Sequence, residues 1–361
     1  MSIQGAVASP LRLTVQVPPF LSIVIPVYNG GAAFVDCLLS IKCSTFTDWE
    51  LIVVDDSSED KSALLAEELG AILLYTGGRL GPGAARNLGA QAAQGLYLCF
   101  VDADCEVLPE TLTNLVQTLK FHPEIDALFG SYDDQPKALN LVAQYKNLFH
   151  HYVHQHGNED ASTFWTGCGT IRRALFLSLG GFDVERYQRP SIEDIDLGYR
   201  IKQAGGKICL AKNVQVKHHK AWTLFGLIKT DVLDRGIPWT RLMLSRKFFS
   251  KDLNLETRSR VSVVAIYLLL LSLGVGVVFR PGLGLALALG LALLGLNQDV
   301  YGFFWRKRGV FFTLGVIPLH WLYYFYSGIA FTSGLILHQV DQTVAKSRGA
   351  GVKQKPTGPQ L

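Results

Sequence analysis

The sequence of 361 residues has few acidic residues near its end and no cysteine pattern that binds metal or staples a small fold. The six cysteines contain no C-x-x-C pair and no regular spacing, which excludes a zinc finger and a disulfide framework. Several lie in apolar runs, so we expect reduced thiols in a cytosolic domain. The first twenty residues lack a charged stretch followed by a long apolar run, so we expect no signal peptide.

Acidic residues are almost missing after residue 258, where only Asp299 and Asp341 remain. Nine basic residues share that segment, so it carries +7 and the first 258 residues carry −3 of the overall +4. Basic residues that flank apolar runs are typical of membrane proteins. The positive charge therefore indicates a bilayer as partner and excludes a nucleic-acid surface.

Three common phosphate-binding or metal-binding loops are incomplete in this chain. The glycine-rich stretch 81–86 lacks the sixth-position glycine of a dinucleotide fingerprint, and 78–85 has no Lys-Ser/Thr of a P-loop. The spacing of Asp102, Asp104 and Glu106 begins like a calcium loop, but its glycine and distal glutamate are absent. These three classes of site are therefore excluded.

Short apolar runs alternate with helical patterns in the first part of the chain. The runs predict strands at 21–26, 51–54, 71–75 and 96–101, and the intervening patterns predict helices at 34–41, 58–70 and 84–93. This alternation favours an α/β fold with a mostly parallel central sheet and helices on both faces. Ligands of such sheets bind at the carboxyl ends of the strands, where Asn29, Asp55 and Asp102 lie.

Two carboxylates one residue apart, Asp102 and Asp104, follow the apolar run 96–101. Carboxylate oxygens are the ligands that Mg²⁺ and Mn²⁺ prefer, and these ions complete their shells with substrate phosphates. Aspartate is also common in turns at strand ends. Taken alone, the pair is compatible with either a cation site or a turn.

The C-terminal part contains three uncharged runs, at 261–279, 282–296 and 310–337. The second is short for a span, and the third contains Pro318 and His320. We expect two to three membrane helices. The first two runs would form a hairpin that returns the basic cluster 306–308 to the cytosol. The last run is either a membrane span or a re-entrant or interfacial segment. The predicted segments are an N-terminal extension (1–19), a catalytic domain (20–220), linker or interfacial helices (221–258), a membrane region (259–340) and a basic, disordered tail (341–361).

Six motifs, in order and spacing, give the first 220 residues a family resemblance. They are 25–29 (IPVYN), 54–58 (VDDSS), 83–87 (GAARN), 101–104 (VDAD), 180–183 (GGFD) and 192–197 (IEDIDL). Together they resemble glycosyltransferase family 2, whose members are inverting enzymes with the GT-A fold. The resemblance covers Leu21 to His219 and implies a nucleotide-sugar donor, with UDP favoured, and a divalent cation, Mg²⁺ or Mn²⁺.

The resemblance also implies roles for individual residues. Nucleotide-sugar binding falls to Pro26, Tyr28, Asn29, Asp55, Asp56, Arg86 and Asp102. Asp104 would ligate the cation, with Asp102 nearby and His218 as a further ligand, although its neighbour His219 is the alternative. Asp194 would be the general base that deprotonates an acceptor hydroxyl, and Glu193 is the second candidate. Without the other motifs, the same acidic pair is explained by a first helical turn that complements the helix dipole.

Two further segments are open to more than one interpretation. Residues 164–169 form either a wall of the acceptor or sugar site or part of the core. Residues 231–239 resemble the Q-x-x-R-W motif of processive synthases, but the glutamine is missing and three residues separate Arg235 from Trp239. The surrounding stretch 222–249, rich in apolar, aromatic and basic residues, favours an interfacial helix.

We therefore expect an integral membrane glycosyltransferase whose catalytic domain faces the cytosol. The acceptor would be a hydroxyl of a membrane lipid, a lipid-linked saccharide or a glycan. The alternatives are a polyprenyl-phosphate glycosyltransferase, whose anionic acceptor needs no base, and a non-catalytic scaffold that binds nucleotide-sugar.

Overall fold

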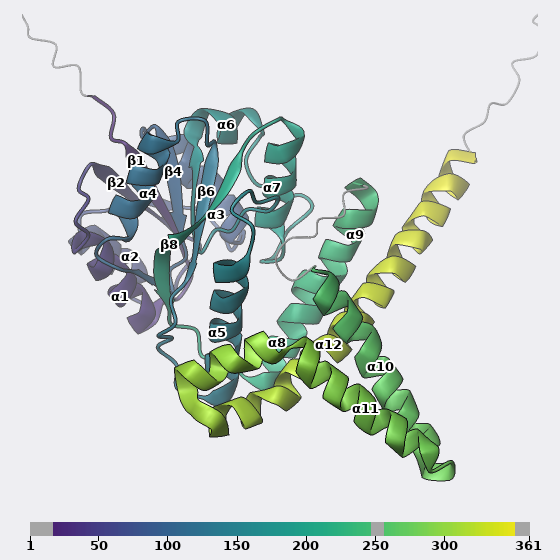
Figure 1. Ribbon diagram of the computed structural model, residues 1–361. Coiled ribbons are helices and arrows are strands. Elements are labelled where there is room, and N and C mark those ends of the chain that lie inside the picture. Colours follow the sequence, from purple (N-terminus) through teal and green to yellow (C-terminus); the bar gives the residue numbers. More distant parts are fainter. Residues whose placement is uncertain (1–16, 247–255, 351–361) are drawn as a thin grey trace, which may run out of the picture.

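The computed structural model describes residues 17–246 and 256–350, which form a sheet domain and a helical region (Figure 1). The sheet domain contains β1 (Leu21–Val27), α1 (Gly31–Lys42), β2 (Trp49–Asp55), α2 (Ser62–Glu68), β3 (Ile72–Tyr75), α3 (Pro82–Ala92), β4 (Tyr97–Val101), β5 (Cys105–Val107), α4 (Thr111–Phe121), β6 (Ala127–Tyr132), α5 (Leu141–His156), β7 (Cys168–Arg172), α6 (Arg173–Ser178), α7 (Glu193–Gln203) and β8 (Ile208–His218). The helical region contains α8 (Leu224–Lys229), the π-helix η1 (Thr230–Gly236), α9 (Ile237–Arg246), α10 (Thr257–Val278), α11 (Pro281–Leu296) and α12 (Gln298–Ala350).

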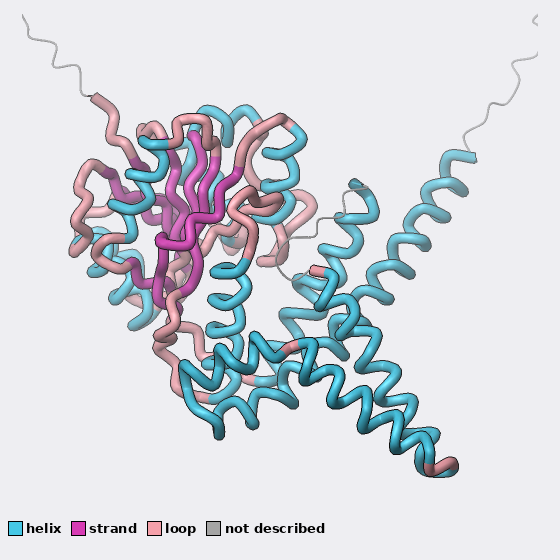
Figure 2. Tube along the Cα trace, in the orientation of Figure 1, coloured by secondary structure: helices cyan, strands magenta, loops and turns pink. Residues whose placement is uncertain are grey.

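The eight strands form one sheet in the order β3-β2-β1-β4-β7-β6-β8-β5 (Figure 2). The four strands predicted from sequence are β1 to β4, and they pair in parallel as expected. The expectation of a mostly parallel sheet holds only in part for the other half, where β6 and β8 pair in parallel. There β7 runs antiparallel to both β4 and β6, and β5 runs antiparallel to β8. The sheet is therefore mixed, as in the GT-A fold.

Alternation of apolar side chains along the strands builds a core on each face of the sheet. In β1, Ile23 and Ile25 point to one face, together with buried residues of α1, α2 and α4. Val24 points to the other face, which is covered by α3, α6 and α7. Because β1 is buried on both faces, its residues other than Ser22 are apolar instead of alternating with polar ones.

The parallel pairing brings the carboxyl ends of β1, β2 and β4 to one edge of the sheet. Val27 lies opposite Asp55 in the β1–β2 register, and β4 flanks β1 on its other side. The side chains that follow these strands, including Asn29 and Asp102, therefore collect at one edge.

The helical region extends away from the sheet domain, with α10 and α11 paired as a hairpin (Figure 1). Helices α10 and α12 are long and apolar enough to cross a membrane, whereas α11 has only 16 residues. The chain turns at Gly309 within α12, where φ is 82° and ψ is 177°. Residues 341–350, which we assigned to the disordered tail, continue α12, and the rest of that segment lies outside the described residues.

Candidate active site

A cleft of about 570 Å³ lies at the edge where β1 and β4 end. Its lining includes Pro26, Tyr28, Asn29, Arg86, Asp102, Asp104, Glu193 and Asp194. Asp55, Asp56 and His218 lie outside this lining. The structure thus brings eight of the eleven predicted site residues together in one cleft. The most distant of them in sequence, Pro26 and Asp194, are 168 positions apart.

The β1–α1 loop is fastened to the β2–α2 loop by reciprocal hydrogen bonds. The N–H of Asn29 donates to Ser58 Oγ over 2.9 Å, and the Asn29 Oδ1 accepts the N–H of Glu59 over 2.8 Å. Asn29 has φ of 50°, a left-handed conformation that asparagine tolerates better than most residues. This fixes Tyr28 at the mouth of the cleft, where the guanidinium of Arg79 lies 4.0 Å from the centre of its ring.

Asp55 is buried at the end of β2 and has one carboxylate oxygen without a partner. Its Oδ2 accepts the N–H of Ser58, whereas Oδ1 has no hydrogen-bond partner among the described residues. A buried acceptor of this kind is costly unless a donor reaches it. The described residues supply no donor to this oxygen.

Asp56 has a different environment from the one its predicted role requires. Its carboxylate accepts the N–H groups of Leu80 and Gly81 and the hydroxyl of Thr76, each over 2.8 Å. Both oxygens are thus occupied by the loop that leads into α3. In this structure, Asp56 shapes the glycine-rich loop instead of facing the cleft.

Arg86 is a buried cation between two of the predicted acids. Its Nη2 donates to Asp102 Oδ1 over 2.6 Å, and its Nη1 lies 3.5 Å from Glu193 Oε1. Glu193 also accepts the N–H of Ser191 over 2.8 Å and is buried. These contacts occupy Glu193 and leave Asp194 as the acid of the pair available for chemistry.

Asp104 and His218 face each other at the end of β8. The distance from His218 Nε2 to Asp104 Oδ2 is 3.5 Å. Burial raises the pKa of the Asp104 carboxyl, but the hydrogen bond and the charge of His218 outweigh it and hold that pKa below its usual value. His219 points to the opposite side of the strand, where it pairs with Glu106 over 3.0 Å. Of the two histidines, His218 is therefore the one placed to share a cation with Asp104.

Asp194 is half-buried at the N-terminus of α7 and lines the cleft. Its only hydrogen bond among the described residues comes from the N–H of Ile195, over 2.8 Å. Burial, followed by the charge of Glu193, raises the pKa of the Asp194 carboxyl to about 7. A carboxylate with that pKa suits a general base at neutral pH.

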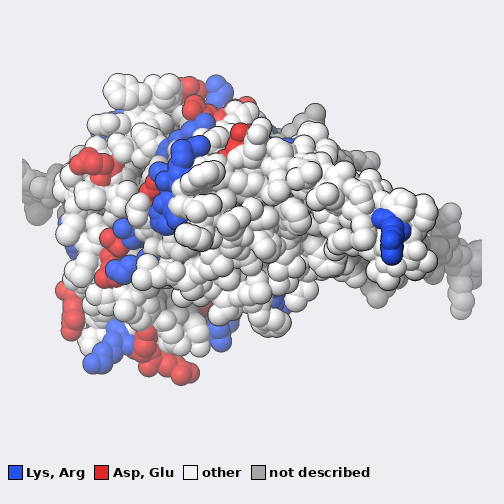
Figure 3. Space-filling view, turned by 60° about the horizontal axis from the view of Figure 1, so that its bottom comes forward, with Lys and Arg blue, Asp and Glu red and all other residues white. Residues whose placement is uncertain are grey.

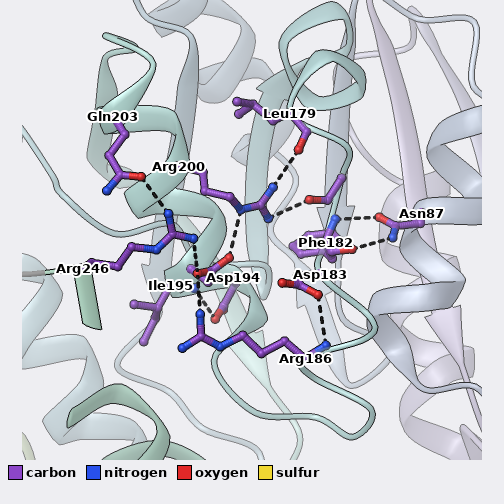
Figure 4. A network of polar contacts seen from close by, with 12 residues as sticks. Asn87, Leu179, Phe182, Asp183, Arg186, Asp194, Ile195, Arg200, Gln203 and Arg246 are labelled. Carbon is purple, nitrogen blue, oxygen red and sulfur yellow. Dashed lines mark hydrogen bonds and ion pairs between the residues drawn. The ribbon is translucent and has the colours of Figure 1, made fainter. Parts of the chain in front are cut away.

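The start of α7 is held in place by a network of arginines (Figure 4). Arg200 donates to Asp196 over 2.9 Å and to the carbonyls of Leu179 and Gly181. Arg246 of α9 reaches the same buried Asp196 over 3.3 Å. These bonds tie α7 to the Gly-Gly turn and to the helical region, so they position Asp194 without taking part in chemistry.

Helix α5 supplies a wall that the sequence analysis missed. Lys146, Phe149, His150, Val153 and His154 line the cleft from this helix. Burial lowers the pKa of His150 well below its ordinary value and that of His154 to about 4, so both rings are neutral at pH 7. Their spacing of three to four residues was the available signal, because it places them on one helical face.

The helical region supplies a further part of the lining, and residues 164–166, within the stretch left open in the sequence analysis, line the cleft as well. Arg235 of η1, Trp239 of α9 and Tyr323 of α12 complete the cleft. Asp231 of η1 joins these helices to α5, since it accepts from Lys146 over 2.8 Å and from the hydroxyl of Tyr326 over 2.8 Å. The cleft is therefore built jointly by the sheet domain and the apolar helices.

Comparison with known proteins agrees with this geometry. Residues 22–180 match the family described as glycosyl transferase family 2. A mannosyltransferase from Pyrobaculum calidifontis, solved in complex with GDP-Man and Mn²⁺, has the same fold. Its TM-score is 0.52 at 15% identity, over 88% of this chain and 88% of that one. Residues 22–180 are therefore similar to glycosyl transferase family 2, and the fold is GT-A-like.

Curated relatives share shorter stretches. The uncharacterized glycosyltransferase YibD of Escherichia coli is 36% identical over 110 residues, which is 29% of this chain and 32% of that protein. The glycosyltransferase GlyG of Streptococcus pneumoniae is 31% identical over 117 residues, which is 31% of this chain and 38% of that protein. An uncharacterized protein of Mycobacterium tuberculosis is 28% identical over 60% of this chain and 73% of its own length. The chain spans about a third of the first and second of these proteins.

Proposed function

We propose that this protein transfers a sugar, with inversion, from a nucleotide-sugar to a hydroxyl of a membrane-associated acceptor. The observation that carries the proposal is the cleft itself, which Asp104 and Asp194 both line. Inversion requires the acceptor to attack from the side opposite the leaving diphosphate. A cation ligand, Asp104, and a proton acceptor, Asp194, in one cleft support this arrangement.

The residues present fit a hard divalent cation, Mg²⁺ or Mn²⁺. Asp104 offers a carboxylate, His218 an imidazole nitrogen 3.5 Å from it, and Asp102 a second carboxylate near Asp104. The third grouped residue, Cys105, has a pKa well above its ordinary value because of burial, so it stays a neutral thiol and is no ligand for a hard ion. When bound, the cation would stabilise negative charge on the departing diphosphate.

The protein's own groups supply the remaining steps. Tyr28 and Asn29 would bind the nucleotide, with the free oxygen of Asp55 accepting from its base. Asp194 takes the proton of the acceptor hydroxyl as that oxygen bonds to the anomeric carbon and the sugar–phosphate bond breaks. The buried ion pair of Arg86 keeps Asp102 in position.

The apolar helices support a membrane-anchored acceptor. Exposed apolar side chains cover the α10–α11 hairpin, including Leu271 at 64% and Leu287 at 66% exposure. Figure 3 shows charged residues gathered on the sheet domain and a nearly uncharged surface over the extended helices. Such a surface is unfavourable in water and favourable in a bilayer.

The contacts of the basic cluster 306–308 support a proposal for the orientation. Lys307 forms an ion pair with Asp134, and Arg308 donates to Gln144 over 2.9 Å, so the basic cluster contacts the sheet domain. Basic residues next to a membrane segment stay in the cytosol. We therefore propose that the catalytic domain lies in the cytosol. Helix α12 packs against α5 and α9, which favours an interfacial position for the last apolar run.

The competing function is transfer to a polyprenyl phosphate. Arg235 and Lys220 line the cleft and form no ion pair with any described residue, so a phosphorylated acceptor would find free cations there. An anionic acceptor needs no base. Replacement of Asp194 by asparagine would leave transfer to polyprenyl phosphate intact but abolish transfer to a hydroxyl.

The test is a screen of nucleotide-sugar donors by release of free nucleotide, in membranes or detergent with Mn²⁺. Lipid extracts serve as the source of acceptor, and Asp104→Ala serves as the blank. Acceptor-dependent release by the wild type that the blank lacks supports the proposal. No turnover of any donor across the panel would overturn it, and binding of nucleotide without turnover would identify a scaffold.

A further inference from the structure

Asn147 of α5 makes a contact with His218 that the proposed reaction does not use. The distance from Asn147 Oδ1 to His218 Nδ1 is 2.7 Å, and both side chains are buried, with 1% and 4% exposure. The ring of Tyr132 stacks on the imidazole, with centroids 4.2 Å apart and an interplanar angle of 8°. The ring is therefore fixed in plane by Tyr132 and in rotation by Asn147.

The chemistry of the two groups fixes the proton. An amide oxygen only accepts hydrogen bonds, so His218 Nδ1 must carry the hydrogen. In the neutral ring, Nε2 then presents its lone pair, and Nε2 is the atom 3.5 Å from Asp104 Oδ2. A divalent cation held by Asp104 would therefore meet the Nε2 lone pair of His218.

The burial of Asn147 adds a second observation. Its Nδ2 has no hydrogen-bond partner among the described residues. A buried amide that leaves its donors unpaired is destabilising, and the bond to His218 is the side-chain hydrogen bond that Asn147 makes among the described residues. A leucine of similar volume would fill the same space without that cost.

We propose that Asn147 is a positioning residue for the metal site, which holds His218 in the tautomer that binds a divalent cation together with Asp104. The inference rests on the metal dependence proposed above. Partners of this kind, placed behind a histidine ligand, change metal affinity by about 10-fold to 100-fold when they are removed.

The experiment measures Mn²⁺ binding to the full-length protein in detergent, with UDP present, by electron paramagnetic resonance. Asn147→Leu removes the acceptor oxygen, whereas Asn147→Asp keeps it. The matched control is Gln155→Leu. It removes bonds from the same helix to Ser131 and to the Lys212 carbonyl, without touching His218.

We expect Asn147→Leu to weaken Mn²⁺ binding by about 10-fold to 100-fold, while Asn147→Asp and Gln155→Leu bind like the wild type. Equal affinity of the wild type and Asn147→Leu would overturn the inference. Equal loss in the leucine and aspartate variants would also overturn it, because the acceptor oxygen would then be irrelevant.

A spectroscopic readout covers the case in which the leucine variant does not fold. Electron spin echo modulation from ¹⁴N reports a nitrogen bonded to Mn²⁺, and we expect it in the wild type and in Asn147→Asp. Mn²⁺ bound by the wild type without this signal refutes the role of His218 and hence of Asn147. A wild type that binds no Mn²⁺ refutes the metal dependence of the proposed function instead.

Discussion

Replacement of Asp194 by asparagine should make the protein more stable and less active. Burial and Glu193 raise the pKa of this carboxyl from 3.8 to about 7. Each pKa unit corresponds to about 1.4 kcal/mol, so the ionised form costs the folded state about 4 kcal/mol above pH 7. An asparagine of the same shape carries no charge but still buries a polar group, at a cost of about 1–2 kcal/mol. We expect a net gain of about 2 kcal/mol at pH 8.

The sign of the pH dependence follows from proton binding. Between pH 4 and pH 7 the folded protein holds a proton on Asp194 that the unfolded chain has lost. The wild type therefore loses stability as the pH rises through this window. The asparagine variant lacks this loss, so its advantage should be large at pH 8 and absent at pH 4. Urea unfolding followed by tryptophan fluorescence at both pH values measures it, with Glu185→Gln as an exposed-carboxylate control.

Activity should change in the opposite direction. Loss of a general base typically lowers kcat by about 10²-fold to 10⁴-fold, with a smaller effect on KM. In the wild type, kcat/KM should fall tenfold per pH unit below about pH 7, where Asp194 becomes protonated. A variant that is destabilised at pH 8, or that still transfers sugar to a hydroxyl at the wild-type rate, would refute the assignment of Asp194 as base.

Three further predictions concern the buried Arg86, the Gly-Gly turn and the apolar hairpin. Arg86→Met leaves the buried Glu193 and the half-buried Asp102 without a cation, so we expect a loss of about 3 kcal/mol in unfolding free energy, with Arg86→Lys intermediate. Gly181→Ala places a Cβ 2.4 Å from Asn87 Oδ1 at a φ of 70° and should lower the unfolding free energy by about 3 kcal/mol. The control Gly180→Ala has a φ of 77° but meets no atom within 4 Å, so it should lower the unfolding free energy by about 1 kcal/mol. The double substitution of Leu271 and Leu287 by lysine should release the protein from membranes in carbonate extraction, because each lysine costs about 3 kcal/mol in the bilayer. Unchanged melting curves for the first two, or membrane retention of the third, would contradict the roles assigned here.

The parallel half of the sheet was predictable because its strands are buried on both faces. The run 21–26 is apolar in succession, and this pattern needs no knowledge of its neighbours. The antiparallel strand β7, with the sequence CGTIR, has neither length nor a strong pattern. Its direction depends on a long-range partner, which the local sequence does not encode.

The site, like the sheet, contains residues that the sequence predicts and residues that it does not. Asp102, Asp104 and Asp194 follow from local motifs, and their gathering in one cleft follows from sheet topology. The role of Asp56 could not be predicted, because it depends on the path of the loop at 76–81. Arg235 and Trp239 line the cleft through the packing of the helical region, whereas their sequence pattern departs from the Q-x-x-R-W motif and did not predict this place.

The position of a bound Mn²⁺ ion tests the central claim most directly. Anomalous diffraction from crystals of the protein with Mn²⁺ and a non-transferable UDP-sugar analogue would locate the ion. The account predicts a single strong peak between Asp104 and His218, with the anomeric carbon of the sugar between the ion and Asp194. A peak at the cluster of Asp36, Glu106 and His219, or a sugar whose anomeric carbon faces away from Asp194, would contradict it.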